Sequence, residues 1–317
     1  MRVLRYPSLV SLACAVLLST VLNAPAAAYQ DQVQRFGALI TRNVPYATVD
    51  GLPLYLDVWR SFDSSTSDSG NGLKRYVVGD MLPVAVYIHG GGWRGGDKGD
   101  HPDLLQPVVE AGYLVFSINY RLSQQARFPA QLSDCKAAIR WIRKHAAEYG
   151  GDGERIGVFG TPAGGHLCAL LGATNGVAAL EGTVGETGAS SSVQAVCDWS
   201  GPVNLQKFQD APRNARSMIE QLLGDTAEQR PDLAAAASPV QWIDAGDPPF
   251  LIIHGKNDPL IPYGQSVELE QRLREAGVPA ELIVIPQGKH GRFWKTDPNQ
   301  EELLARMIAF FDEYVRR

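Results

Sequence analysis

The chain has 317 residues and a formal net charge of −5; 45% of its residues are hydrophobic and 20% are charged. This balance supplies enough apolar sequence for a substantial core, so the composition excludes a disordered chain and a polytopic membrane protein. The mildly acidic charge lacks the basic surface that nucleic-acid binding requires, so a DNA- or RNA-binding protein is excluded as well.

The first 28 residues are typical of a secretory signal peptide. Arg2 and Arg5 precede an apolar run at residues 9–22, and three consecutive alanines close the segment. The apolar run is short for a bilayer span, and small residues occupy the position that signal peptidases require. We therefore expect a secreted or periplasmic protein with a mature domain at 29–317 and no stable membrane span. An uncleaved N-terminal anchor is the alternative.

Short β-rich runs alternate with longer helical patterns along the rest of the chain, after a Ser-, Asp- and Gly-rich loop at residues 61–72. The expected strands are residues 52–60, 83–89, 113–120, 155–160, 193–199, 250–254 and 281–286. The expected helices are residues 130–149, 163–173, 218–223, 263–276 and 299–317. This alternation predicts an α/β domain in which a mostly parallel central sheet carries helices on both faces.

Residues 202–247 interrupt the alternation of strands and helices. They are rich in proline and contain one short helical pattern, and they stand between two expected strands. A segment of this kind predicts a small lid inserted into a single domain.

Three cysteines remain after the expected signal peptide, and we expect them to be buried thiols. Cys135, Cys168 and Cys197 are an odd number, so at most one internal disulfide can form. Each lies in an expected helix or apolar strand. Because no CxxC pair or histidine cluster accompanies them, we expect neither a metal site nor any other cofactor.

Four motifs follow expected strands, where open α/β sheets place their ligands. They are His-Gly-Gly-Gly-Trp at 89–93, Gly-Thr-Pro-Ala-Gly-Gly at 160–165, His-Gly-Lys-Asn-Asp-Pro at 254–259 and Gly-Lys-His-Gly at 288–291. Consecutive glycines allow backbone N–H groups to approach a developing oxyanion closely. Alone, such a run is also compatible with a flexible turn.

Together these motifs resemble the α/β-hydrolase family of serine esterases, whose chain order is nucleophile, acid, histidine. The resemblance is closest to the secreted esterase/lipase branch with a G-x-S-A-G-G elbow, which includes feruloyl and acetylxylan esterases. It implies an α/β-hydrolase fold and a carboxylic-ester hydrolase that acts on a small-molecule or carbohydrate ester. By this resemblance Asp258 is the triad acid, His290 is the general base, and the backbone N–H groups of Gly91, Gly92 and Ala163 are the oxyanion donors.

The sequence departs from the family at the nucleophile, because Pro162 stands where the serine is expected. Proline has no hydroxyl for His290 to deprotonate, and its φ near −65° is incompatible with the strained, positive-φ elbow. We expect Thr161 to cap the following helix and Pro162 to be its first residue. His166, one turn later, is interpreted as a packing or hydrogen-bonding residue. The prediction is an exported esterase homologue that is inactive or strongly impaired.

Two alternatives to an inactive enzyme stay open, as does the oligomeric state. The first is an active esterase with an unrecognised nucleophile. Thr161 is expected to point away from the pocket because strand side chains alternate, and Ser200 ends another strand, where we expect it to cap the lid segment. The second is a non-catalytic protein that binds a carbohydrate or acyl ligand. Its aromatic walls would be Trp93, Trp199 and Trp294, unless these serve the core.

Overall fold

The computed structural model describes residues 32–35, 38–61, 81–209, 211–291 and 295–317. The expected signal peptide, nearly all of the expected loop at 61–72 and the candidate aromatic wall Trp294 lie outside the described residues. Within the described ranges, no helix has both the length and the apolar character that crossing a bilayer requires.

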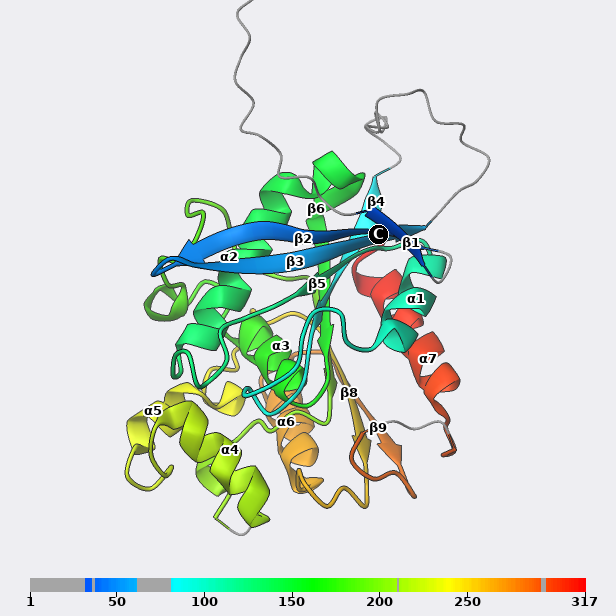
Figure 1. The fold of residues 1–317 in the computed structure, drawn as a ribbon. Helices are drawn as coiled ribbons and strands as arrows, with labels where there is room; N and C mark the ends of the chain where they lie inside the picture. The colour runs from blue at the N-terminus through cyan, green and yellow to red at the C-terminus, as the bar shows by residue number, and fades with distance from the viewer. Residues whose placement is uncertain (1–31, 36–37, 62–80, 210, 292–294) are drawn as a thin grey trace, which may run out of the picture. The chain divides into compact units, whose positions relative to one another are not determined.

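The described strands form one nine-stranded sheet in the order β1-β2-β3-β5-β4-β6-β7-β8-β9 (Figure 1). The pairs β1–β2, β2–β3 and β3–β5 are antiparallel, and every other neighbouring pair is parallel. The strands are β1 (Gln32–Arg35), β2 (Ala38–Val49), β3 (Leu52–Ser61), β4 (Leu82–Ile88), β5 (Leu114–Ile118), β6 (Gly151–Gly160), β7 (Ala195–Trp199), β8 (Phe250–Gly255) and β9 (Ala280–Ile285). The sheet is therefore mostly parallel, as the sequence predicted.

Helices cover both faces of this sheet. Buried side chains of α1 (Pro102–Glu110) and α7 (Gln300–Tyr314) pack in one apolar cluster. Those of α2 (Ala130–His145), α3 (Ala163–Ala173) and α6 (Gly264–Glu275) pack in a second cluster. The prediction of helices on both faces is confirmed.

Strand β4 shows why its sequence demands two covered faces. Val84, Val86 and Ile88 belong to the cluster with α2 and α3, whereas Ala85 and Tyr87 belong to the cluster with α1 and α7. All five side chains are fully buried. Because successive strand residues point to opposite faces, an uninterrupted apolar run can be buried only between two layers of helices.

Several elements at the start of the described chain were not predicted, namely β1, β2 and α1. Helix α1 begins at Pro102 and contains Pro107, and prolines disfavour a helix in sequence-based reasoning. Tertiary packing overrides that signal, because Leu104, Leu105 and Val108 are buried against the sheet. The predicted helix at 163–173 coincides with α3. The predicted helix at 130–149 comprises α2 and a 3₁₀ turn, Ala146–Tyr149.

The segment for which an inserted lid was predicted lies between β7 and β8. Its helices are α4 (Arg213–Leu223) and α5 (Pro231–Ala236), with 3₁₀ turns η3 (Leu205–Lys207) and η4 (Pro239–Gln241). In α4 the buried side chains are Ala215, Ile219, Leu222 and Leu223. Their i, i+4, i+7, i+8 spacing gives one apolar stripe, so this helix presents a single face to the body of the domain.

Close packing of β6 against α3 depends on glycine at position 164. A methyl group there would overlap the carbonyl oxygen of Ile88 in β4, and one on Gly160 would lie 2.5 Å from the carbonyl carbon of Gly164. The first turn of α3 therefore sits directly on the ends of β4 and β6. This contact fixes where the turn between β6 and α3 stands.

Candidate active site

The parallel strands end at one edge of the sheet, and this edge gathers the predicted site residues. The turns after β4, β6, β8 and β9 supply them, in that order: Gly91 and Gly92, then Pro162 and Ala163, then Asp258, then His290. All of them except Asp258 line one cavity, and Asp258 contacts the Nδ1 atom of His290 without lining the cavity itself.

Pro162 forms the turn from β6 into α3. Its φ is −33° and its ψ is −57°, so its backbone is already helical and lies far from the positive φ of a nucleophile elbow. The helix begins at Ala163, and the carbonyl of Pro162 accepts a hydrogen bond from the N–H of His166 at 2.9 Å. The predicted loss of the strained elbow is confirmed at this turn.

The prediction that Thr161 caps α3 is wrong. Pro162 itself is the N-cap residue, and no side chain caps this helix. The Thr161 hydroxyl lies 3.2 Å from the hydroxyl of Tyr87, on the face of the sheet that α1 and α7 cover. Alternation along β6 turns Thr161 away from the cavity, as expected, so its hydroxyl is not available to a ligand there.

Ser200 was also expected to be a cap, and the structure corrects this. Its backbone N–H donates to the carbonyl of Ile253 in β8 at 2.9 Å, and its hydroxyl lies 3.4 Å from the same oxygen. Its φ is +58°, an uncommon value for serine. Ser200 is buried and does not line the cavity with His290.

Asp258 and His290 form the predicted acid–histidine pair. His290 Nδ1 lies 2.7 Å from Asp258 Oδ2, and the side chain of Asp258 is fully buried. Asp258 Oδ1 accepts the backbone N–H groups of Leu260 and Ile261 at 2.8 and 2.9 Å. Burial alone would raise the pKa of Asp258, but its interactions with His254, His290 and these N–H groups outweigh that effect and hold the pKa far below its ordinary value.

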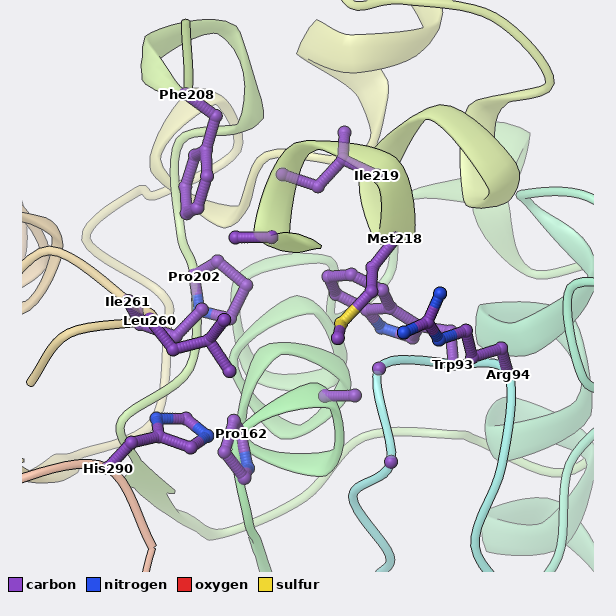
Figure 2. A pocket seen from close by; sticks show the side chains of 14 residues that line it. Trp93, Arg94, Pro162, Pro202, Phe208, Met218, Ile219, Leu260, Ile261 and His290 are labelled. Carbon is purple, nitrogen blue, oxygen red and sulfur yellow. The ribbon is translucent and has the colours of Figure 1, made fainter. Parts of the chain in front are cut away.

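The ionised Asp258 fixes the orientation of the His290 ring. Nδ1 must donate to the carboxylate, so Nε2 is the nitrogen that points toward Pro162 (Figure 2). A general base in an ester hydrolase needs this tautomer. The pair is thus assembled as the chemistry requires, although the residue in front of Nε2 is a pyrrolidine ring.

His254 is a site residue whose role the sequence did not reveal. It is fully buried, its Nδ1 lies 2.6 Å from the Ser266 hydroxyl, and its Nε2 lies 3.1 Å from the carbonyl of Ile261. Nε2 is also 3.5 Å from Asp258 Oδ2. His254 is therefore a second histidine beside Asp258 Oδ2, the oxygen that His290 also contacts. The available signal was its position four residues before Asp258, directly at the end of β8.

The glycine run after β4 adopts a backbone that other residues disfavour. Gly91 has φ +98° and Gly92 has φ +60°. A methyl group on Gly91 would overlap the carbonyl oxygen of Gly95, and one on Gly92 would overlap the sulfur of Met218 in α4. Both glycines and Ala163 line the cavity. As the first residue of α3, Ala163 has a backbone N–H with no partner inside the helix.

The cavity has a volume of about 280 Å³, and the inserted lid closes part of it (Figure 2). Its apolar wall consists of side chains from the lid and from the strand ends: Trp93, Pro162, Ala163, Pro202, Phe208, Ala215, Met218, Ile219, Leu260 and Ile261. Among the described residues that line it, the charged or titratable ones are Arg94 and His290. The sequence did not indicate which residues of the lid form this wall.

His166 and Trp93 form a buried pair next to the cavity. The Trp93 indole N–H donates to His166 Nδ1 at 3.2 Å, and His166 Nε2 lies 2.7 Å from the carbonyl of Ala237. Full burial lowers the pKa of His166 to about 4, so the ring is neutral. The interpretation of His166 as a packing and hydrogen-bonding residue is confirmed. Trp93 serves both the core and the cavity, whereas Trp199 is buried in the opposite cluster.

The three cysteines of the domain are free and buried, as expected. Burial raises the pKa of each thiol well above its ordinary value, which disfavours the thiolate. None of Cys135, Cys168 and Cys197 lines the cavity.

Comparison with known proteins places these features in a family. A model of the BD-FAE family matches residues 76–273, more than half of the chain. The match contains the glycine run, the turn at Pro162 and Asp258, and it ends before His290.

Curated esterases are similar to this chain. Esterase LipQ of Mycobacterium tuberculosis is 32% identical over 86% of this chain and 61% of its own length. Carboxylesterase NlhH of the same species is 34% identical over 74% of each chain. The chain spans about three fifths of the length of LipQ and of Esterase LipC, which is also 32% identical.

Solved structures share the fold. A truncated carbohydrate esterase from gut microbiota has a TM-score of 0.77 and 30% identity, over 90% of this chain and all of that chain. A bifunctional GH43-CE protein of Bacteroides eggerthii has a TM-score of 0.73 and 33% identity, over 86% of this chain and 38% of its own. The α/β-hydrolase fold predicted from the sequence is thereby confirmed.

Proposed function

Since this chain belongs to the BD-FAE family of α/β-hydrolase esterases, we propose that it is a carboxylic-ester hydrolase homologue that is inactive or strongly impaired in ester hydrolysis. The observation that carries the proposal is the helical backbone of Pro162 at the turn between β6 and α3. In serine esterases this turn presents the nucleophile at positive φ, in front of the histidine. Here it presents a ring without a hydroxyl, so His290 has no group to activate.

Two observations support the proposed origin of the site. The buried, ionised Asp258 orients His290, and Gly91, Gly92 and Ala163, the proposed oxyanion donors, line the cavity. These parts alone would bind an ester and polarise its carbonyl, since oxyanion donors and binding leave roughly 10³–10⁴-fold catalysis over water when triad members are removed. Asp258, His290 and the oxyanion donors are therefore proposed as the vestige of a catalytic site.

The test is hydrolysis of short-chain p-nitrophenyl esters by the purified wild-type chain beside a His290→Ala variant. The proposal expects both proteins to release nitrophenol at the same slow rate, because no step depends on His290 without a nucleophile. Multiple turnovers at esterase rates that His290→Ala abolishes would refute it and would reveal an unrecognised nucleophile.

A second candidate function is binding of a small-molecule or carbohydrate ligand without turnover. The observation that favours it is the cavity of about 280 Å³ with a mostly apolar wall, close to the lower limit of ordinary ligand sites. The names of similar proteins, a carbohydrate esterase and a carboxylesterase, favour a carbohydrate ester or another carboxylic ester as the ligand. Saturable binding of an ester without release of acid or alcohol distinguishes this function from a site that has lost both binding and catalysis.

We also propose that the protein is exported, on the basis of Arg2, Arg5 and the apolar run at 9–22. Expression of the full chain and of a variant without residues 1–28 tests this. Export predicts that the full chain is found outside the cytoplasm in a shortened form, whereas the variant stays inside. A full chain retained in the cytoplasm at its original mass would contradict export.

A further inference from the structure

Arg94 is a cation at the cavity that the lost hydrolysis does not explain. It follows the glycine run directly and lines the cavity together with Trp93 and Met218 (Figure 2). Its backbone is held in place, because its N–H donates to Gly91 at 3.2 Å and its carbonyl accepts from the Gln124 side chain at 2.7 Å. Among the described residues, no carboxylate lies within 4.0 Å of its guanidinium.

Arg94 is the cationic side chain among the described residues that line the cavity. Gly91, Gly92 and Ala163 line the same cavity, and the N–H group of Ala163, the first residue of α3, has no partner inside the helix. The described residues that line the cavity include no Asp or Glu. The polar end of this cavity is therefore built for a negative charge.

The rest of the cavity favours an apolar body attached to that charge. Phe208, Ile219 and Met218 of the lid face Leu260 and the ring of Pro162 across it (Figure 2). Pro162 itself extends the apolar wall up to the donors, where a serine would have placed a hydroxyl. Such a surface gains free energy from each buried CH₂ group of a ligand.

Resting on the proposed loss of hydrolysis, we infer that this cavity binds a free monocarboxylate with an apolar tail, and that Arg94 is the residue that selects the acid over its ester. The carboxylate lies at the backbone N–H groups and Arg94, and the tail lies between the lid and Pro162. An ester has the same tail and no charge, so it gains little from Arg94. The cavity thus holds what an esterase would release rather than what it would cleave.

The test is calorimetric titration of the full chain with octanoate and with octanamide, which share tail and shape and differ in charge. Wild-type protein is expected to bind octanoate at least tenfold more tightly than octanamide. Each added CH₂ from butanoate to octanoate should tighten binding about fourfold while the tail still fits. Equal affinity for acid and amide, or no binding of octanoate, would overturn the inference.

Two arginine variants show whether Arg94 makes the selection. Arg94→Gln is expected to weaken octanoate binding about five- to tenfold and octanamide binding less than twofold. Arg213→Gln removes the same charge from an exposed position at the start of α4 that does not line the cavity, and it should change neither. An equal loss of octanoate binding in both variants would contradict a role for Arg94, since only general charge would then matter.

The same protein samples separate this inference from the proposed function. Each is incubated with ethyl octanoate, and NMR spectroscopy follows the release of ethanol. Sustained release by wild type would refute the loss of hydrolysis, whatever the ligand preference is. Absence of release together with equal binding of acid and amide would leave the loss of hydrolysis intact and reject the carboxylate site.

Discussion

Replacement of Pro162 by serine tests whether the missing hydroxyl alone accounts for the proposed loss of ester hydrolysis. Serine at 162 would enter the cavity that His290 Nε2 faces, with Asp258 already 2.7 Å from Nδ1. The tight glycines at 160 and 164 that let the turn lie on β4 are still present. What must change is the backbone at 162, from φ −33° to the positive φ of an elbow.

The magnitude follows from two opposing terms. Removing the nucleophile from a serine hydrolase costs about 10⁶-fold in kcat. The strain of a positive φ costs on the order of 1–3 kcal/mol. If all of this strain adds to the activation barrier, it lowers the gain in rate by about one to two orders of magnitude. Pro162→Ser is therefore expected to exceed the wild-type esterase rate by about 10⁴-fold or more.

The assay is hydrolysis of p-nitrophenyl butyrate by wild type, Pro162→Ser, Pro162→Ala and the double variant Pro162→Ser/His290→Ala. Alanine is the matched control, because it removes the ring without adding a hydroxyl, and it should stay at the wild-type rate. The double variant should lose the gain. A serine variant no faster than the alanine variant would refute the reasoning, since more than the nucleophile would then be lost.

Three further predictions concern the frame of the site. His166 is neutral in the fold with a pKa of about 4, so the unfolded chain takes up a proton first as pH falls below 6.5. Between pH 6.5 and 4, the free energy of unfolding in urea should therefore fall by about 3 kcal/mol less in His166→Gln than in wild type. Gly164→Ala should cost about 3 kcal/mol or more in urea unfolding, because its methyl group meets a backbone carbonyl, whereas Gly264→Ala, in open space at the start of α6, should cost nothing. Glu181→Gln should cost about 3 kcal/mol in the same assay, because it leaves the fully buried Lys136 ammonium, now 2.6 Å from Glu181, without its counter-charge. The first prediction is contradicted if His166→Gln and wild type lose the same stability as pH falls. The second is contradicted if the two glycine variants are equally stable, and the third if Glu181→Gln is as stable as wild type.

The fold was predictable where the sequence carries strong periodicity. The apolar strands β4 and β8 and the helix α3 were predicted with nearly the right ends, because runs that must be buried on both faces leave few alternatives. Helix α1 was missed because its two prolines disfavour a helix locally, whereas packing against the sheet decides the outcome.

The site was predictable as far as local motifs determine it. The chain order of the motifs and the topology of a parallel sheet placed Gly91, Pro162 and His290 at one edge, and these three residues line one cavity. The contacts of His254 and the selection of Met218 and Phe208 for the wall depend on how distant segments pack, which local patterns do not encode. The same reason explains why Thr161 pairs with Tyr87 instead of capping α3.

The most direct test of the central claim is reaction of the wild-type chain with a fluorophosphonate probe, followed by intact-mass spectrometry and peptide mapping. Such probes form a stable adduct with an activated serine or threonine hydroxyl. Because position 162 holds a proline, wild type should keep its unmodified mass while Pro162→Ser gains one adduct at residue 162. An adduct on any residue of the wild-type chain would contradict the account, and its position would identify the nucleophile.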